Sequence, residues 1–246
     1  MITPLREHLV EYAISHCFSS SCLLCGRQSS RPLCSDCLDI NYLDKIDGLS
    51  LLRDSPHRCA HCGRPLISRN KLCTSCLTLD VLSVIDRVLP LFYYSPANSL
   101  LLNSWKTHGQ RGLGYPFARM MSIPILETLA RDKDMIIVPV PPRPGKIREK
   151  GWDQIEELGT LLQRYWKLPV KSILRRTATM QQKKLNRAGR LSNLKGCITA
   201  KKSLVGISSA LVIDDIMTTG ATLESCAAAL KESGVSRVYG CTLFFD

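Results

Sequence analysis

Two adjacent carboxylates and a turn rich in hydroxyl groups carry the strongest chemical signal in the sequence. Asp214 and Asp215 end an apolar stretch, and the turn 218–222 (TTGAT) follows after two residues. A turn that opens a helix offers unpaired backbone N–H groups and the positive end of the helix dipole, and both favour a bound phosphate. Carboxylates repel a phosphate, so we expect the acids to contact neighbouring ribose hydroxyls, or a metal ion that serves those hydroxyls.

Two interpretations of this stretch are open. In the first, Gly220 lets the main chain approach a phosphate closely, and the hydroxyls of Thr218, Thr219 and Thr222 add hydrogen-bond donors. In the second, a threonine caps an ordinary helix and the acids are solvated at the end of a strand. The apolar strand, the acid pair and the glycine turn together favour the first, which predicts a site for a phosphate monoester.

Strands and helices that alternate along residues 81–246 must position this site. The expected strands are 84–95, 135–142, 209–215 and 235–245. The expected helices are 99–109, 115–131, 152–166 and 221–234. Pro124 is expected to break or kink the second helix. The alternation predicts an α/β fold with a mainly parallel sheet, helices on both faces, and a ligand site beyond the carboxyl ends of the strands.

Eight of the twelve cysteines form two matched units. The units read CLLCGRQSSRPLCSDC (22–37) and CAHCGRPLISRNKLCTSC (59–76). A C-x-x-C turn brings two thiolates to one tetrahedral ion, and two such turns complete a closed structural Zn²⁺ site with no open position for catalysis. The predicted metal ligands are Cys22, Cys25, Cys34, Cys37, Cys59, Cys62, Cys73 and Cys76.

The division of these ligands is open in the sequence. Each unit can bind its own ion, or a cross-braced site can join the first and third cysteine pairs. The repeat favours two separate sites, and a redox role for the C-x-x-C pairs accounts poorly for four pairs in two matched units. The predicted domains are therefore an N-terminal helix with a cysteine-rich module at 1–80, and the α/β domain at 81–246.

The net charge of +12 is concentrated in one segment. The basic residues between 171 and 202, where there is no Asp or Glu, are Lys171, Arg175, Arg176, Lys183, Lys184, Arg187, Arg190, Lys195, Lys201 and Lys202. Such a segment is either a solvated face or a loop that meets polyphosphate or nucleic acid. Residues 175–196 include no aromatic side chain on which a base could stack, which favours contact with phosphates over contact with bases.

The chain has no apolar run near the roughly 18 residues of a membrane helix, and its first twenty residues are interrupted by charges. A secretory signal has an uninterrupted apolar centre, so we expect a cytoplasmic protein without membrane insertion.

The stretch VIDDIMTTGAT (212–222) resembles the phosphoribosyl-pyrophosphate (PRPP) motif of type I phosphoribosyltransferases. In that family the acid pair meets the ribose hydroxyls and the loop holds the 5′-phosphate. The resemblance implies a phosphoribosyltransferase-like domain with PRPP contacts at Asp214, Asp215, Thr218, Thr219, Gly220, Ala221 and Thr222.

Further motifs resemble the ComF-type competence proteins. The run 150–154 (KGWDQ) is similar to their R-G-F-N-Q motif, with Asp153 adding a negative charge near the implied pyrophosphate site. Lys106 matches a lysine common before the core strands, and the cysteine units resemble a double zinc ribbon. A Q-x-x-L-x-x-x-x-R-x-x-N pattern is met by Gln182, Leu185, Arg190 and Asn193.

The ComF resemblance implies an accessory protein of DNA uptake in natural transformation. Its implied ligands are PRPP with Mg²⁺, and its implied partners are single-stranded DNA or other uptake proteins. The alternative is an active phosphoribosyltransferase that moves phosphoribose to a nucleobase or related amine. Thr218 stands where some purine enzymes carry an acidic general base, so no catalytic residue is assigned. The candidate pyrophosphate contacts are Arg143, Lys146, Arg148, Lys150, Arg187 and Arg190.

Overall fold

A computed structural model describes residues 20–46, 49, 51, 57–67, 70–78, 82–177, 197–200, 204 and 206–246. The expected N-terminal helix and most of the basic segment lie outside the described residues, and so do Gln182, Leu185, Arg187, Arg190 and Asn193. The predicted domain boundary at 80/81 also falls there and stays a prediction.

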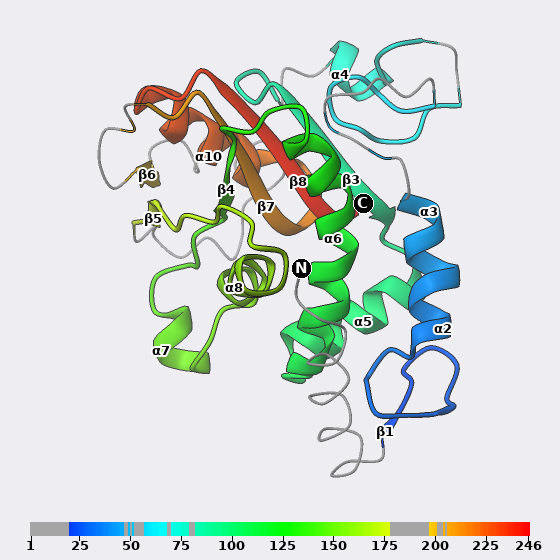
Figure 1. Ribbon diagram of the computed structural model, residues 1–246. Coiled ribbons are helices and arrows are strands. Elements are labelled where there is room, and N and C mark those ends of the chain that lie inside the picture. Colours follow the sequence, from blue (N-terminus) through cyan, green and yellow to red (C-terminus); the bar gives the residue numbers. More distant parts are fainter. Residues whose placement is uncertain are drawn as a thin grey trace.

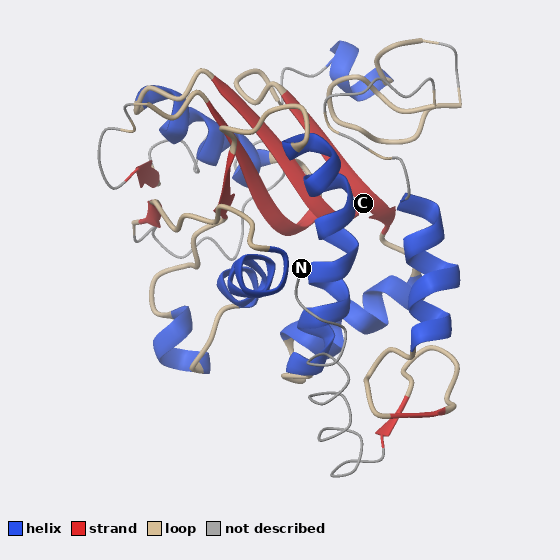
Figure 2. Ribbon diagram, viewed as in Figure 1, coloured by secondary structure: helices blue, strands red, loops and turns tan. Residues whose placement is uncertain are grey.

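A four-stranded parallel sheet forms the centre of the molecule (Figures 1 and 2). Its strands, in spatial order, are β3 (Arg87–Tyr93), β8 (Arg237–Phe245), β7 (Ser209–Met217) and β4 (Ile136–Pro139). A parallel bridge from Ile137 to Val170 extends the edge beyond β4. Strands covered on both faces read as continuous apolar runs, and β4 is buried along its whole length. The predicted α/β class with a mainly parallel sheet is confirmed.

Helices cover both faces of this sheet. On one face, α6 (Gly114–Leu129) and α8 (Gln154–Trp166) pack beside each other, and α10 (Ala221–Glu232) packs behind the sheet (Figure 1). Asp153 caps α8 because its carboxylate accepts the backbone N–H groups of Ile155 and Glu156. The remaining helices near the sheet are α5 (Pro96–Lys106), η2 (Arg111–Leu113) and α7 (Lys146–Lys150).

Of the two effects expected of Pro124, a break or a kink, the break does not occur. The helix α6 continues through Pro124 to Leu129, and both Pro124 and its neighbour Ile125 are buried. The hydroxyl of Thr128 donates to the Pro124 carbonyl at 2.7 Å, so the turn after the proline keeps a bonded carbonyl. Packing against β8 and α8 therefore outweighs the local cost of a proline inside a helix.

The two cysteine units pack on different parts of the α/β core (Figure 1). The first contains β1 (Ser20–Ser21) and β2 (Gln28–Ser29), continues into α2 (Ser35–Leu38), η1 (Asp39–Leu43) and α3 (Asp44–Ile46), and contacts α5 and α6. The second ends in α4 (Thr74–Thr78) and lies against β3. A further short hairpin pairs β5 (Leu174–Arg176) with β6 (Ile198–Ala200). None of the described helices has the length and apolar character needed to cross a membrane.

The second unit touches β3 so closely that one glycine leaves no room for a side chain. A Cβ at Gly63 would lie 2.2 Å from the Val88 carbonyl oxygen and 2.6 Å from Cδ of Pro90. At the matching position of the first unit, a Cβ at Gly26 would meet nothing within 4 Å. Both glycines have positive φ, +69° and +72°, so the conformational cost of a side chain is the same at both.

We predict that Gly63→Ala destabilises the protein more than Gly26→Ala does. Each substitution costs about 1 kcal/mol for the left-handed backbone. The clash at Gly63 adds roughly 1–3 kcal/mol, as overpacking of a filled site does. Urea unfolding of both zinc-loaded variants measures the difference. Equal losses would contradict the close docking of the second unit on β3.

Candidate functional site

The two acids lie near the end of strand β7, at the carboxyl edge of the sheet. Strand β7 runs two residues beyond the predicted end at 215, because Ile216 and Met217 continue to pair with β8. Successive residues of a strand point to opposite faces. Accordingly, Asp215 pairs with Lys106 at the end of α5. Asp214 lies on the side of α10: the pKa of Cys226 in that helix is raised mainly by burial and, to a smaller extent, by the charge of Asp214.

Only one of the two acids has a cationic partner in an ion pair among the described residues. The ammonium of Lys106 donates to Oδ1 of Asp215 at 2.7 Å, and the Asp215 side chain is only 10% exposed. Asp214 instead accepts the backbone N–H of Asp215 at 2.8 Å. Burial raises the pKa of Asp214 to about 8, and the neighbouring Asp215 carboxylate raises it further against the opposing effect of Lys106. The partly buried Asp214 is therefore the acid left to meet a ligand.

The turn after β7 adopts the conformation that its sequence predicts. Gly220 has φ of +80° and directly precedes α10, and the hydroxyl of Thr219 accepts the N–H of Ala221 at 3.3 Å. Thr218 is exposed, and its carbonyl accepts a hydrogen bond from Arg64 at 2.8 Å. The turn thus leads directly into the N-terminus of α10, where the first N–H groups have no carbonyl partner within the helix, as the phosphate-binding interpretation requires.

The candidate cations after β4 lie on or beside the short helix α7, and their partners differ. Lys146 binds Asp153 at 2.6 Å and also contacts Gln154, so its ammonium is already engaged. Arg143 pairs with Glu149 at 2.7 Å, with both side chains more than half exposed. Lys150 donates to the Lys106 carbonyl at 3.3 Å. Gln154 donates to that same carbonyl, which connects the 150–154 motif to the helix that carries Lys106.

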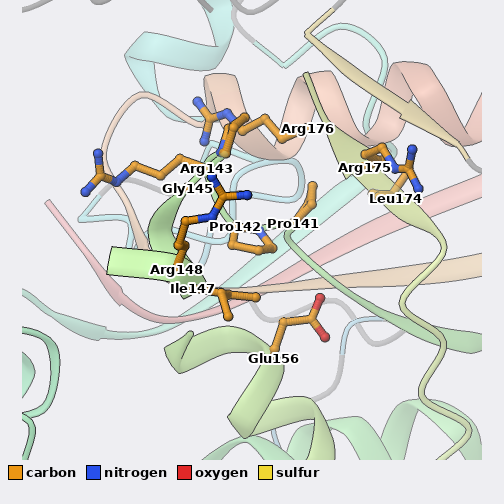
Figure 3. Close-up of a pocket in the computed structure, with 11 residues that line it drawn as sticks. Pro141, Pro142, Arg143, Gly145, Ile147, Arg148, Glu156, Leu174, Arg175 and Arg176 are labelled. Carbon is orange, nitrogen blue, oxygen red and sulfur yellow. The ribbon is translucent and has the colours of Figure 1, made fainter. Parts of the chain in front are cut away.

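An open pocket of about 390 Å³ lies beside this loop and is lined by arginines (Figure 3). Arg143, Arg148 and Arg176 lie together on one side of it, and Arg175 lies on the other, with Glu156 projecting from α8. The lining therefore holds four positive charges and one negative charge, and one of the four, Arg143, is paired with Glu149. Arg175 and Arg176 were not predicted as site residues; their signal was the basic segment, which the structure brings to the loop through strand β5.

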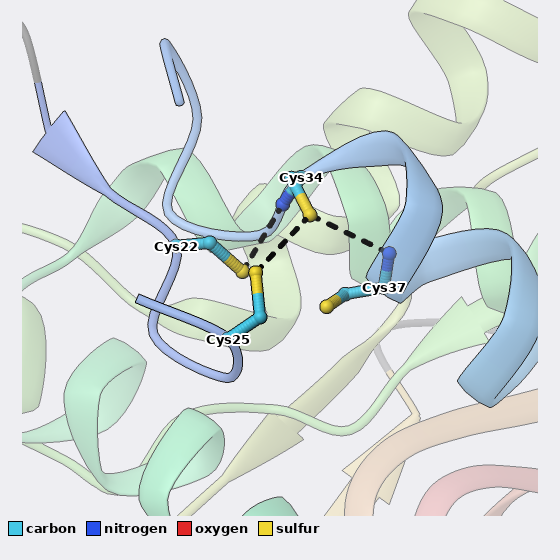
Figure 4. A group of neighbouring side chains, drawn as sticks. All are labelled: Cys22, Cys25, Cys34 and Cys37. Carbon is cyan, nitrogen blue, oxygen red and sulfur yellow. Dashed lines mark hydrogen bonds between the residues drawn. The ribbon is translucent and has the colours of Figure 1, made fainter. Parts of the chain in front are cut away.

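The eight predicted metal ligands gather into two groups of four. The sulfurs of Cys22, Cys25, Cys34 and Cys37 lie within 4.8 Å of one another (Figure 4), and those of Cys59, Cys62, Cys73 and Cys76 do the same. The grouping is sequential, not cross-braced. A tetrahedral zinc with bonds of about 2.3 Å separates its sulfurs by about 3.8 Å. The distances of 3.8 Å between Cys25 and Cys34 and 3.6 Å between Cys62 and Cys73 fit that ion.

Each group prepares one thiol for ionisation. Burial opposes ionisation of Cys22, but backbone N–H groups, including that of Cys34 at 3.5 Å, outweigh burial and lower its pKa to about 6. At Cys59, too, hydrogen bonds from backbone N–H groups outweigh burial and lower the pKa to about 7. Burial and neighbouring sulfur raise the pKa of Cys37 and Cys62 above the ordinary value. Four thiols that compete for negative charge suit a divalent cation, and both groups fit zinc-ribbon modules.

Comparisons with known proteins find relatives that match most of the chain. No protein-family model matches the chain. Competence protein F of Haemophilus influenzae is 25% identical over 187 residues, which cover 73% of this chain and 81% of that protein. Competence protein ComFC of Bacillus subtilis is 29% identical over 224 residues, covering 87% and 89%, and ComFC of Streptococcus pneumoniae is 26% identical over 226 residues, covering 90% of each.

The chain is similar to ComF-type competence proteins over most of its length. Matches of up to 90% of the chain reach across both the cysteine units and the α/β core, so the likeness is not confined to a single motif. The family resemblance expected from residues 150–154 and 212–222 is confirmed.

We predict that the two acids affect stability with opposite signs. The Asp214 pKa rises on folding, so its ionisation destabilises the folded state as pH rises from about 4 towards about 8. Asp214→Asn keeps an acceptor for the N–H of Asp215 and removes that cost. Its free energy of unfolding should therefore exceed that of wild type by an amount that grows over this pH range.

The matched variant is Asp215→Asn, which removes the negative charge that pairs with Lys106 and should destabilise the protein at neutral pH. Urea unfolding of both variants between pH 5 and 8.5 makes the comparison. A gain for Asp214→Asn that does not change with pH would contradict the raised pKa.

For the cysteine groups we predict two zinc ions in each chain. Their removal by a chelator should unfold the units, because segments this short have few core residues and metal binding supplies much of their folding energy. Elemental analysis of the purified protein counts the ions, and circular dichroism follows the loss of structure. One ion per chain would overturn the assignment of two separate groups.

Proposed function

We propose that the carboxyl edge of the sheet binds PRPP and that the chain acts as an accessory protein of DNA uptake. The observation that supports this ligand is that the two adjacent acids beside the turn 218–222 have different partners. Lys106 neutralises Asp215, whereas Asp214 has no ion pair within the described part of the chain. A sugar phosphate can bind to both the carboxylates and the turn, because its hydroxyls donate hydrogen bonds to carboxylates and its phosphate accepts them from the N–H groups of the turn.

The three parts of PRPP correspond to three parts of the edge. Asp214 and Asp215 bind the ribose hydroxyls, and the turn residues Thr218, Thr219, Gly220, Ala221 and Thr222 bind the 5′-phosphate. The pyrophosphate faces the loop after β4, where Arg143 and Arg148 line the basic pocket and Lys150 lies close by. Mg²⁺, which neutralises pyrophosphate oxygens in such ligands, would accompany it. Lys146 contributes less directly, because it is bound to Asp153.

The role in DNA uptake rests on the relatives, three of which carry the name competence protein. The arginine-lined pocket adds a physical reason. Its four arginines outnumber Glu156 and the Glu149 that pairs with Arg143, so they would attract the phosphates of a single strand as well as those of PRPP. Arg187 and Arg190, which lie outside the described residues, belong to the same basic segment.

Titration calorimetry with Mg-PRPP tests the ligand. We predict that Asp214→Ala/Asp215→Ala weakens binding more than tenfold, since each lost hydrogen bond to a charged group costs about 1.5–3 kcal/mol. The control variant Asp134→Ala, which removes an exposed acid outside the proposed site, should bind Mg-PRPP as wild type does. Equal heats from wild type and the double variant would sink the assignment.

Single-stranded DNA is tested in the same titration. If the strand and PRPP affect each other, the coupling must be reciprocal, so PRPP must change DNA affinity by the same factor. Binding through phosphates must also weaken steeply with salt.

Transfer of phosphoribose to a nucleobase or related amine is the second candidate. It is favoured by the Asp214 pKa of about 8, because a carboxyl group with such a pKa can exchange a proton near neutral pH. Release of pyrophosphate that requires both PRPP and one acceptor would establish it. PRPP binding without any such release leaves the first proposal standing alone.

A further inference from the structure

Arg64 connects the second cysteine unit to the turn that follows β7. Its backbone belongs to the first C-x-x-C turn of that unit, residues 59–64, which we call the knuckle. The Arg64 carbonyl accepts the N–H of Cys59 at 2.8 Å, and Gly63 donates to the Cys59 carbonyl at 2.9 Å. Its guanidinium reaches the other way and donates from Nη2 to the Thr218 carbonyl at 2.8 Å. One residue thus contacts, through its two ends, the backbone of a predicted metal ligand and a turn 154 positions further along the chain.

The second unit is held firmly enough on the sheet to serve as a fixed support. The N–H of Val88 donates to the His61 carbonyl at 2.7 Å. The guanidinium of Arg58 donates to the carbonyl groups of Pro90 at 2.7 Å and Leu91 at 3.3 Å. With Gly63 in contact with the backbone of β3, the knuckle and this strand form one packed body.

The turn is supported from the same side at two further points. A Cβ at Gly220 would lie 2.6 Å from Cδ2 of Leu82, so the turn rests on that side chain. In the first turn of α10, Glu224 accepts the backbone N–H groups of Val84 at 2.6 Å and Ile85 at 3.1 Å. The segment 82–85, which leads from the second unit into β3, therefore holds the beginning of the helix as well.

The bond from Arg64 determines the direction of a neighbouring donor. The described residues include no cis peptide bond, and in a planar trans peptide the C=O and N–H groups point in opposite directions. Arg64 holds the Thr218 carbonyl toward the cysteine unit, so the N–H of Thr219 in the same peptide points away from that unit. A guanidinium on the carbonyl also polarises the peptide and makes this N–H a stronger donor.

The first cysteine unit provides an internal comparison. Arg27 follows Gly26 in the same C-x-x-C-G-R motif, yet it pairs with Asp36 of its own unit at 3.3 Å, and its side chain is 74% exposed. The motif alone thus does not create the contact with the turn. Only the unit that packs on β3 brings its arginine there.

We propose that Arg64 is a positioning residue that couples the second metal group to the phosphate turn: a folded, metal-loaded knuckle holds the Thr218–Thr219 peptide in the orientation that donates to a bound phosphate. The inference rests on the proposed binding of PRPP at this turn. Because coupling between two sites is reciprocal, a ligand in the turn also stabilises the knuckle and slows loss of its metal.

The affinity of Mg-PRPP, measured by calorimetry, is the first test. Arg64→Ala should weaken binding roughly tenfold, the size expected for loss of one charge-assisted hydrogen bond that orients a donor. Arg27→Ala should bind as wild type does. Arg64→Lys should recover part of the loss, since an ammonium can donate to the same carbonyl. If wild type binds PRPP and Arg64→Ala binds it equally well, the coupling is wrong while the proposed function stands.

Zinc release gives a readout that a purely structural arginine would not move. With a coloured chelator in excess, saturating PRPP should slow the release of one of the two zinc ions from wild type and from Arg27→Ala. In Arg64→Ala, PRPP should leave both release rates unchanged. A ligand effect that survives in Arg64→Ala would overturn the inference.

Hydrogen exchange of the unliganded protein separates the two proposals. The amides of residues 219–222 should exchange faster in Arg64→Ala than in wild type or Arg27→Ala, whether or not PRPP is the ligand. If wild type does not bind PRPP, the proposed function fails, and this measurement still decides whether Arg64 orients the turn. Equal exchange in all three proteins then rules out the positioning role too.

Discussion

The site depends on a shortage of positive charge at one point: of two adjacent carboxylates, only Asp215 is paired with an ammonium among the described residues. Lys106 binds Asp215 and leaves Asp214 with a raised pKa, because burial and the neighbouring charge both oppose its ionisation. Such an arrangement costs stability in the empty protein and is relieved when ligand hydroxyls or a cation arrive. The elements around it maintain this condition, since α5 presents Lys106 and the 150–154 motif holds the end of α5 through Gln154.

The two cysteine units support the α/β core at different places. Each unit is too short to fold on apolar contacts alone, so a metal group supplies rigidity at a defined place. The first unit supports the helices α5 and α6, where Tyr42 donates to Asn98 at 2.6 Å. The second supports β3 and the turn after β7. The first unit thus supports the helix that carries Lys106, and the second supports the turn that would hold a phosphate.

Apolar periodicity and turn residues were sufficient to predict the sheet and its main helices, because these signals are local. Strand ends were less well predicted: β7 extends past Asp215 because β8 continues beside it, which no local pattern reveals. The helix α6 continues through Pro124 for a related reason, since burial against β8 and α8 outweighs the local cost of the proline. Arg175 and Arg176 were visible only as part of a basic segment, and strand β5 determined that they face the loop after β4.

The sequence by itself determined the chemical groups that are close along the chain. The cysteine spacing sets the two ligand groups, and Asp214, Asp215 and the glycine turn follow one another within nine residues from 214 to 222. Only the tertiary structure decided which acid is paired and which arginine reaches the turn. Lys106 and Asp215 are 109 residues apart, and Arg64 and Thr218 are 154 apart. Contacts over such separations arise from how strands and knuckles pack, so two arginines in identical motifs have different partners.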